Sequence, residues 1–465
     1  MSELLTGIYI VAAVVFLFGA AVFFHELGHF VVARLCGMKV VEFAIGFGPK
    51  IFGRRRNGID YSWRWIPAGG YVKLPQMITS EALEGKGDEE QVPPAPPLSK
   101  IMVAFAGPMM NVIFAFVIAT VIYFVGLPVL VNPSFIGKMD PDSAEYKMGI
   151  REGDRIVEVN GTPVKSWQEV NYETVTARTN VLPVVIERAG ERKTYYLTAK
   201  ASDAVGLKWL NLDPREHPIV GYVDPGSPAK AAGLEQGDRI VSFGGVPVMD
   251  QGHLVDLVAK AKGKPTEIVV ERDHKDITST VTPHYDSGHE QWRIGIGFSG
   301  GTYEVQRPGP TPWTQCSKVI RQTVGTFSAL LHSHETGVKP SDLSGPVGIL
   351  SILAVQVKTD YRLALSFMVL LNINLAILNL LPVPVLDGGH ILMAIIEGIR
   401  RRPLNVKFVE YTTTAFAIVL ISFMLYVTIF GDLKRFSIFR GMFSSPVQVE
   451  QPANSPPSQA PAKAD

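Results

Sequence analysis

The sequence predicts a polytopic α-helical membrane protein with four transmembrane helices, a membrane-associated β-hairpin region and two tandem extracytoplasmic domains. Three observations predict it: four long apolar runs without charge, a strand-rich stretch between the first two runs, and an internal repeat with a period of 84 residues. Hydrophobic residues make up 47% of the 465-residue chain and charged residues 19%. The net charge of +1 gives no electrostatic reason to expect nucleic-acid binding.

Each apolar run is long enough to cross a bilayer, which takes roughly 20 residues. The first run is not expected to be a removed signal peptide, because residues 1–7 contain no Lys or Arg and no cleavage site follows. The four runs are Leu4–Phe24, Ile101–Val125, Leu363–Leu386 and Tyr411–Gly431.

Two arginine triplets orient these spans. Arg54–Arg56 lies between the first two runs and Arg400–Arg402 between the last two. The positive-inside rule assigns both loops to the cytoplasm. Lys434, Arg435 and Arg440 after the fourth run weaken this assignment without reversing it. The long segment from about residue 126 to 361 is then extracytoplasmic, and periplasmic in a Gram-negative cell.

That long segment contains the repeat. Gly153–Val157 (Gly-Asp-Arg-Ile-Val) returns as Gly237–Val241, and the flanking Ser143 and Pro163 return as Ser227 and Pro247. A repeat of this length predicts two tandem copies of one small domain, at 127–212 and 213–307. The strand–turn–strand–helix pattern of each copy resembles PDZ domains, which bind extended peptides by strand addition. Two alternatives stay open: rigid spacers that bind nothing, and a barrier that keeps bulky extracytoplasmic domains from the membrane.

Residues 37–79 form the strand-rich stretch. Met38–Ile45 and Ile59–Ile66 are rich in β-branched and aromatic residues, and the glycines of Gly46–Pro49 and Gly69 punctuate them. We expect β-hairpins, with a further strand over Gly70–Leu74. Such a hairpin either enters the membrane beside the first span or remains a cytoplasmic hairpin. Residues 80–100 are acidic and Pro-rich, and predict a flexible cytoplasmic loop.

A metal-site signature, His25-Glu26-Leu27-Gly28-His29, follows the first run directly. On a helix the two histidines lie on one face and can bind the same metal ion. Glu26 is then placed to act as general base for an attacking water. Ionisable groups at the centre of a membrane span cost about 2.5–3.5 kcal/mol each on insertion scales, so a cluster of them there indicates a function.

A catalytic zinc site needs a third protein ligand. The third run ends in Pro382 and Pro384, which would interrupt an α-helix, and Asp387 follows immediately. Asp387 and the arginine triplet after it belong to the same cytoplasmic side as His25. We therefore expect Asp387 to be the third ligand, with His390 as the rival candidate.

Together these motifs resemble the site-2 protease family of intramembrane zinc metalloproteases, from Glu3 to about Phe443. The resemblance implies that His25, His29 and Asp387 bind one Zn²⁺ and that Glu26 is the catalytic glutamate. It also implies a membrane-reentrant β region. Candidate substrate-binding residues are Asn379, Pro382 and Pro384 in the third span and Gly70, Tyr71 and Val72 in the β region. Gly107 and Asn111 in the second span also fit the family, and helix packing is the preferred interpretation of both.

The function that the resemblance implies is hydrolysis of a peptide bond within the transmembrane segment of a single-span protein already trimmed outside. An anti-sigma factor in envelope-stress signalling is the typical substrate, and remnant signal peptides are a second class. The protein would reside in the bacterial inner membrane, with its active site near the cytoplasmic side. The alternatives are a non-catalytic PDZ scaffold and a membrane zinc protease acting on soluble misfolded chains.

The rest of the chain connects these parts. Apolar residues recur at near-helical spacing over Trp313–Leu331, which predicts an amphipathic helix on the outer membrane surface within a linker over 308–361. The expected ranges are 1–36 for the first helix, 101–126 for the second, 362–400 for the third segment and 401–432 for the last loop and helix. The tail, 433–465, is expected to be extracytoplasmic and disordered after about residue 446.

Overall fold

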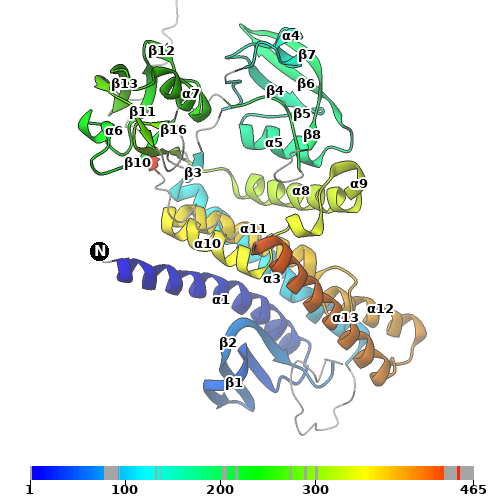
Figure 1. The fold of residues 1–465 in the computed structure, drawn as a ribbon. Helices are drawn as coiled ribbons and strands as arrows, with labels where there is room; N and C mark the ends of the chain where they lie inside the picture. The colour runs from blue at the N-terminus through cyan, green and yellow to red at the C-terminus, as the bar shows by residue number, and fades with distance from the viewer. Residues whose placement is uncertain are drawn as a thin grey trace, which may run out of the picture. The chain divides into compact units, whose positions relative to one another are not determined.

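The computed structural model describes residues 3–77, 93, 95–130, 133–137, 139–201, 207–214, 218–272, 275–286, 291–298, 302–433 and 448–450. The chain forms two compact units (Figure 1). The helical unit comprises Met1–Leu127, Arg307–Thr323 and Leu343–Phe436, and the β-rich unit comprises Pro128–Gln306, Val324–Asp342 and Ser437–Asp465. Most of the flexible loop expected at 80–100 lies outside the described residues.

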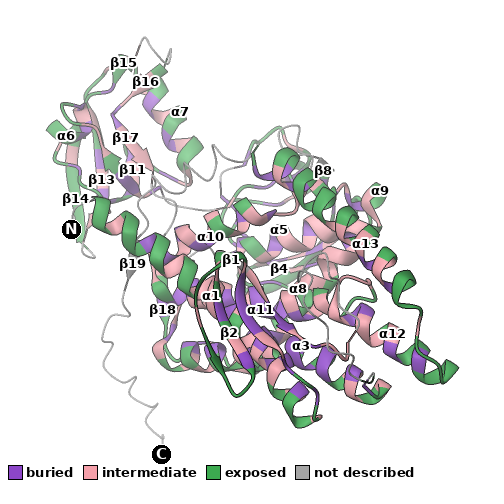
Figure 2. Ribbon diagram, turned by 90° about the horizontal axis from the view of Figure 1, so that it is seen from below, coloured by how far each residue is buried: buried purple, intermediate pink, exposed green. Residues whose placement is uncertain are grey.

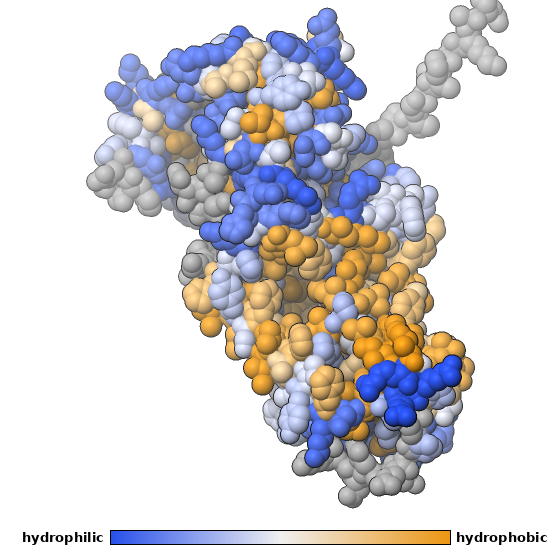
Figure 3. All heavy atoms as spheres, turned by 90° about the vertical axis from the view of Figure 1, so that its right-hand side faces the viewer, coloured by the Kyte–Doolittle hydropathy of each residue, from blue (hydrophilic) through white to orange (hydrophobic). Residues whose placement is uncertain are grey.

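Among the described residues, four helices of the helical unit are long and apolar enough to cross a membrane, as the four runs predict. Hydrophobic residues form a broad band over the surface of this unit (Figure 3). These helices are α1 (Glu3–Leu35), α3 (Pro97–Val125), α11 (Tyr361–Asn379) and α13 (Val406–Val427). All four begin before the predicted runs, by the largest margins at α13, which begins at Val406, and at α3, which begins at Pro97. Helix α1 also continues past the metal motif to Leu35.

Helix α3 is the centre of the helical unit. It packs against α1, α11 and α12 (Asp387–Arg400), and buried residues recur along it (Figure 2). In the most apolar 18-residue stretch of each helix, 44% of the residues are buried in α3 and in α11, but only 11% in α1 and in α13. Helices α3 and α11 therefore form the protein core, while α1 and α13 leave most of their apolar side chains for lipid.

The third predicted segment is not one helix. Helix α11 ends at Asn379 and α12 starts at Asp387, with turns in between, because Pro382 and Pro384 have no N–H to continue a helix. A further helix, α10 (Pro346–Thr359), precedes α11 within the stretch that was expected to be a linker. After α13 the chain makes a π-helical turn, η2 (Thr428–Asp432), where the buried Asp432 carboxylate accepts the N–H of Gly345 at the start of α10.

A buried ion pair joins α12 to the start of α3. Lys100 Nζ lies 2.7 Å from Glu397 Oε2, and both side chains are less than a tenth exposed. The second carboxylate oxygen of Glu397 accepts the N–H of Leu404, so the acid is satisfied on both sides. Removing one member of a buried pair leaves the other charge buried without a partner, which typically lowers the stability of the fold by about 3–5 kcal/mol. This pair therefore makes the position of α12 on α3 costly to change.

The β region forms one ribbon of two long strands, β1 (Glu42–Arg56) and β2 (Ile59–Lys73), rather than several short hairpins. The ribbon is folded on itself, because Glu42–Ile45 pairs with Asp60–Trp63 and also with Gly70–Lys73. The predicted extra strand at Gly70–Leu74 is thus the second half of β2. The apolar face of the ribbon packs on α1 and α3. Phe43 and Val72 of the ribbon belong to one buried cluster with Ala33 of α1 and Val103 of α3.

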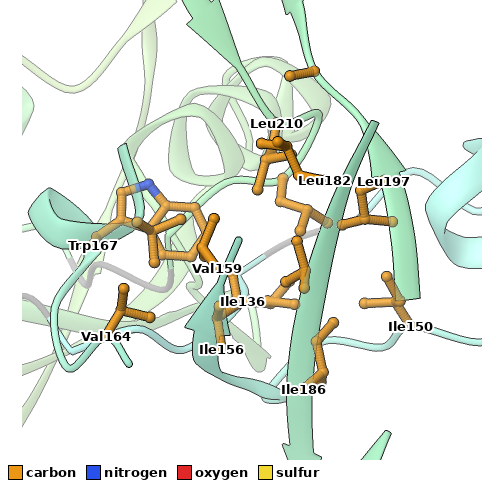
Figure 4. Packing of buried hydrophobic residues seen from close by; sticks show 14 of the residues in the cluster. Ile136, Ile150, Ile156, Val159, Val164, Trp167, Leu182, Ile186, Leu197 and Leu210 are labelled. Carbon is orange, nitrogen blue, oxygen red and sulfur yellow. The ribbon is translucent and has the colours of Figure 1, made fainter. Parts of the chain in front are cut away.

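The β-rich unit contains two four-stranded sheets of matching order, β5-β4-β6-β7 and β12-β11-β13-β14. The first has β4 (Arg155–Val159), β5 (Thr162–Pro163), β6 (Val181–Arg188) and β7 (Glu191–Thr198), with helices α4 (Ala144–Lys147) and α5 (Trp167–Thr176). The second has β11 (Arg239–Phe243), β12 (Val246–Pro247), β13 (Thr266–Arg272) and β14 (Lys275–Val281), with α6 (Pro228–Ala231) and α7 (Gln251–Ala261). Each sheet covers its own apolar core, and Figure 4 shows the first, around Ile136, Ile156 and Leu182.

The repeated Gly-Asp-Arg-Ile-Val motif has a structural role in both sheets. Asp154 and Asp238 are buried, and each accepts two hydrogen bonds from an arginine at the end of the third strand, Arg188 and Arg272. Each arginine also donates to a glycine carbonyl at 2.8 Å. Because planar guanidinium pairs with carboxylate in two places at once, this contact locks the turn before β4 and β11 onto its sheet.

The remaining elements are short or connect the two units. They are β3 (Leu127–Leu130), β8 (Lys200–Ala201), β9 (Lys208–Trp209), β10 (Val220–Val223), β15 (His284–Asp286), β16 (Gln291–Arg293), β17 (Ile296–Phe298), β18 (Thr302–Gln306), α8 (Pro312–Leu331), α9 (Ser333–Thr336) and η1 (Pro340–Asp342). Helix α8 occupies the predicted amphipathic stretch. The tail corrects one expectation, because Gln448–Glu450 form β19 and pair with β18 in parallel.

Candidate metal centre

Three side chains of the helical unit converge on one point. His25 and His29 lie one turn apart on α1, and Asp387 is the first residue of α12. The two histidine Nε2 atoms are 3.2 Å apart. Asp387 Oδ2 is 3.3 Å from His25 Nε2, and Asp387 Oδ1 is 3.4 Å from His29 Nε2. Within the described part of the chain, this is the one group of three metal-ligating residues that gathers so closely.

The spacing of these atoms fits a zinc ion. Zinc binds histidine nitrogen and carboxylate oxygen at about 2.0–2.2 Å in tetrahedral geometry, which separates two ligand atoms by roughly 3.3–3.5 Å. The three distances across the cluster lie at or just below this range. Asp387 Oδ2 is also buried without a hydrogen-bond donor, as expected for an oxygen that faces a cation.

Helix α3 holds both imidazole rings from behind. His29 Nδ1 lies 2.8 Å from the carbonyl oxygen of Val103, which accepts a hydrogen bond from Nδ1–H. With its proton on Nδ1, the ring keeps a free lone pair on Nε2. Between the two rings α3 presents Gly107, where any Cβ would collide with the imidazoles of His29 and His25. The close approach of α1 and α3 is matched at Gly28, where a Cβ would collide with the carbonyl of Ala106.

The amide of Asn111 completes the back of the site. Its nitrogen lies 3.1 Å from His25 Nδ1, and the side chain is fully buried. The sequence favours helix packing as the role of Asn111, and in the structure its amide lies between α3 and α1, against a candidate metal ligand. The residue was therefore visible in the sequence, but its contact was not.

The cluster opens into a cavity of about 210 Å³. Glu26, only 8% exposed, is part of the cavity wall without belonging to the ligand cluster. The other lining residues come from α1, the β ribbon, α3, the start of α12 and α13: His25, His29, Phe47, Gly70, Tyr71, Val72, Leu74, Met77, Val103, Ala104, Val385, Asp387, His390 and Thr413.

The candidate substrate-binding residues divide into two groups. Gly70, Tyr71 and Val72 line the cavity, as expected for a strand beside the metal motif. The second group, Asn379, Pro382 and Pro384, is absent from the lining, where Val385 and Thr413 appear instead. The rival ligand His390 also lines the cavity but lies outside the ligand cluster.

Polar contacts within the ribbon hold Tyr71 in place. Glu42 accepts hydrogen bonds from the Tyr71 hydroxyl at 3.0 Å and from Ser62 at 2.7 Å, and it forms an ion pair with Arg64. Burial raises the pKa of the Glu42 carboxyl, but the hydrogen bonds from Arg64, Ser62 and Tyr71 outweigh it and leave that pKa lowered. Glu42 therefore stays ionised and anchors the strand that borders the cavity.

Comparison with known proteins gives this geometry a family. The model of peptidase family M50 matches residues 13–423, a range that contains all three candidate ligands and Glu26. The chain belongs to peptidase family M50. The predicted resemblance to site-2 proteases is thereby confirmed.

Relatives within the M50 family match over nearly their whole length. The regulator of sigma-E protease RseP of Escherichia coli is 28% identical, with 93% of this chain and 100% of that protein covered. RseP of Salmonella typhimurium is 29% identical with the same coverage. A Neisseria meningitidis protein named provisionally as a zinc metalloprotease is 31% identical over 88% of this chain and 96% of its own.

Two solved structures each resemble a small part of this M50 chain. The PDZ domain of an SdrC-like protein from Listeria monocytogenes matches 18% of the chain and 86% of its own length, at 20% identity and a TM-score of 0.17. A PDZ domain from Listeria innocua matches 18% of the chain and 93% of its own, at 21% identity and the same TM-score.

The contact between the β ribbon and Glu26 leads to a first prediction. A Cβ on Gly70 would lie 2.8 Å from Cγ of Glu26 and 2.8 Å from the Ala44 carbonyl oxygen, so Gly70→Ala must push Glu26 or the strand aside. We expect peptide cleavage to fall by about 10- to 100-fold, the size of effect that a small misplacement produces. The measurement is kcat/KM on a membrane-embedded reporter.

Gly19→Ala is the matched control, because Gly19 lies on the same helix as Glu26 and a Cβ there meets nothing within 4 Å. It should cleave at the wild-type rate. A Gly70→Ala protein as active as Gly19→Ala would contradict the contact between the ribbon and Glu26.

Proposed function

We propose that this protein is an intramembrane zinc metalloprotease that hydrolyses a peptide bond within the transmembrane segment of a single-span protein. The observation that carries the proposal is the meeting of His25, His29 and Asp387 beside Glu26 on a helix apolar enough to span a bilayer. Membership of peptidase family M50 supports it. The relatives that are named as a zinc metalloprotease and as a regulator of sigma-E protease support a zinc-dependent protease as well.

His25, His29 and Asp387 would hold one zinc ion, and Glu26 would serve as general base. The bound zinc would polarise the scissile carbonyl and lower the pKa of the attacking water. Glu26, buried in the cavity wall, would accept the proton of that water and later deliver a proton to the leaving amine. Val103 and the α3 backbone keep the His29 ring turned toward the site while this happens.

Substrate must be extended at the point of cleavage, because the carbonyls of a transmembrane helix are already hydrogen bonded within it. The Gly70–Val72 strand borders the cavity next to Glu26 and is placed to hold such an extended segment by strand addition. Asn379, Pro382 and Pro384 remain proposed contacts for the parts of the substrate outside the cavity.

For the substrate we propose a membrane protein already trimmed outside, typically an anti-sigma factor whose cleavage starts an envelope-stress response. Relatives named as regulators of sigma-E support this class. Remnant signal peptides are a second substrate class. The two matching sheets of the β-rich unit would be tandem PDZ domains in the periplasm that bind a peptide terminus or exclude untrimmed substrates. The protein would lie in the inner membrane with its active site toward the cytoplasm.

Mapping the cut site tests this function. The purified full-length protein is reconstituted with a single-span reporter, and the products are analysed by mass spectrometry with and without a zinc chelator. We expect one cut within the apolar segment that disappears when zinc is removed. A cut only in soluble, unfolded chains would instead indicate a protease of misfolded proteins, and zinc-bound protein that cuts neither would indicate a scaffold.

A further inference from the structure

Asn111 is the buried polar side chain nearest to the metal cluster that the proposed mechanism does not use. It lies on α3 and is 0% exposed. Its amide nitrogen is 3.1 Å from His25 Nδ1, while its amide oxygen is buried without any hydrogen-bond partner. An unsatisfied buried oxygen costs about 1–3 kcal/mol, so this arrangement of the amide needs an explanation.

The chemistry of His25 supplies the explanation. Its Nε2 faces Asp387 and His29, so this nitrogen must keep its lone pair to bind a metal. A neutral imidazole then carries its proton on Nδ1, which becomes a donor. An amide N–H directed at an Nδ1–H would bring two donors together. The oxygen and nitrogen of an amide have nearly the same shape, and turning the Asn111 amide by half a turn replaces this clash with a hydrogen bond.

Helix α3 supports this orientation through a regular row of residues. Val103, Gly107 and Asn111 follow each other at intervals of four and therefore lie on one face of the helix. Val103 accepts from His29 Nδ1 at one end, and the bare backbone of Gly107 leaves room for both rings in the middle. Asn111 stands at the other end, against His25 Nδ1. Each histidine thus meets its own hydrogen-bonding group on α3.

We propose that Asn111 is a positioning residue whose amide oxygen accepts the Nδ1–H of His25 and so selects the form of His25 that can bind the metal. This rests on the proposed zinc site and adds a residue outside its ligands. The proposal also predicts which substitutions at position 111 preserve zinc binding. A carboxylate at position 111 can only accept, so it preserves the contact, whereas a leucine, which has the same branched shape but no polar atom, removes it.

The experiment measures zinc affinity by competition with a chelator, using the full-length protein in detergent and its Asn111→Leu and Asn111→Asp variants. Loss of a hydrogen-bond partner behind a metal ligand typically weakens binding about 10- to 100-fold, and we expect a loss of this size for Asn111→Leu. Asn111→Asp should bind zinc as tightly as the wild type or more tightly. The visible absorption of the cobalt-substituted protein should change in Asn111→Leu and not in Asn111→Asp.

Asn372→Leu is the matched control. Asn372 is also 0% exposed on a membrane helix and also has a buried amide oxygen without a partner, but its amide donates to the Met368 carbonyl instead of a histidine. Its substitution should leave zinc affinity unchanged.

Equal zinc affinity in Asn111→Leu and wild type would overturn the proposal. So would an Asn111→Asp protein that folds but binds zinc as weakly as Asn111→Leu, since the amide would then act as a donor or as packing. If Asn111→Leu does not fold, the zinc affinity of Asn111→Asp is compared with that of the wild type, and binding at least about 10-fold weaker than wild type overturns the proposal. Absence of zinc binding in the wild type would instead refute the proposed function.

Discussion

Replacing Glu26 by Gln should remove peptide cleavage while leaving zinc in place. Glutamine keeps the shape of the side chain but cannot accept a proton, and general-base catalysis typically contributes about 100- to 10,000-fold to a rate. Zinc should remain because Glu26 lies outside the ligand cluster of His25, His29 and Asp387. The measurement combines cleavage of a single-span reporter with the zinc content of the same preparation.

Gly19→Ala serves again as the comparison, because Gly19 lies on the same helix as Glu26 and a Cβ there meets nothing within 4 Å. It should retain most of the activity. Unchanged cleavage by Glu26→Gln would refute the assignment of the general base. Loss of zinc from Glu26→Gln would mean that the glutamate supports the metal and would leave its role in proton transfer unsupported.

Replacing Asp387 by Ala should remove both zinc and activity. The substitution deletes one of three donors, so its effect on zinc affinity should exceed the roughly 100-fold upper range seen when an outer hydrogen-bond partner is lost. It also leaves two histidine nitrogens, 3.2 Å apart, without the carboxylate that faces them both. Zinc content after dialysis against a weak chelator measures the effect.

His390→Ala provides the control for this prediction. His390 lines the same cavity three residues further along α12 and was the rival candidate for the third ligand. Its substitution should leave zinc content unchanged. Equal and tight zinc binding in Asp387→Ala and wild type, with loss in His390→Ala, would reverse the assignment.

Local patterns were sufficient to predict several parts of this structure. Two histidines four residues apart must share a helix face, so the pairing of His25 with His29 follows from the sequence alone. Uncharged runs of spanning length likewise predicted the four long helices. The period of 84 residues also relates Arg188 to Arg272, as it relates Asp154 to Asp238. These two arginines could therefore have been predicted from the sequence as partners of the two aspartates.

Other features depend on how helices rotate and pack, which periodicity does not determine. Asn111 could be assigned to the buried face of α3, but its contact with His25 depends on the rotation of α3 against α1. The Lys100–Glu397 pair joins residues 297 positions apart. The ribbon β1–β2 was expected as separate hairpins because nothing in its composition shows that Glu42–Ile45 pairs on both sides.

The central position of α3 also sets an order of events during biosynthesis. The two histidines on α1 leave the ribosome long before Asp387. Helix α3 is made between them and contacts both α1, through His29, and α12. A nascent chain that has inserted only α1 and α3 would carry Glu26 and two of the three proposed ligands, without a complete zinc site. On the proposed mechanism, hydrolytic activity would then require α12 to dock on α3, where Lys100 meets Glu397. The newly made protease would not cut neighbouring membrane proteins until its own folding is nearly complete.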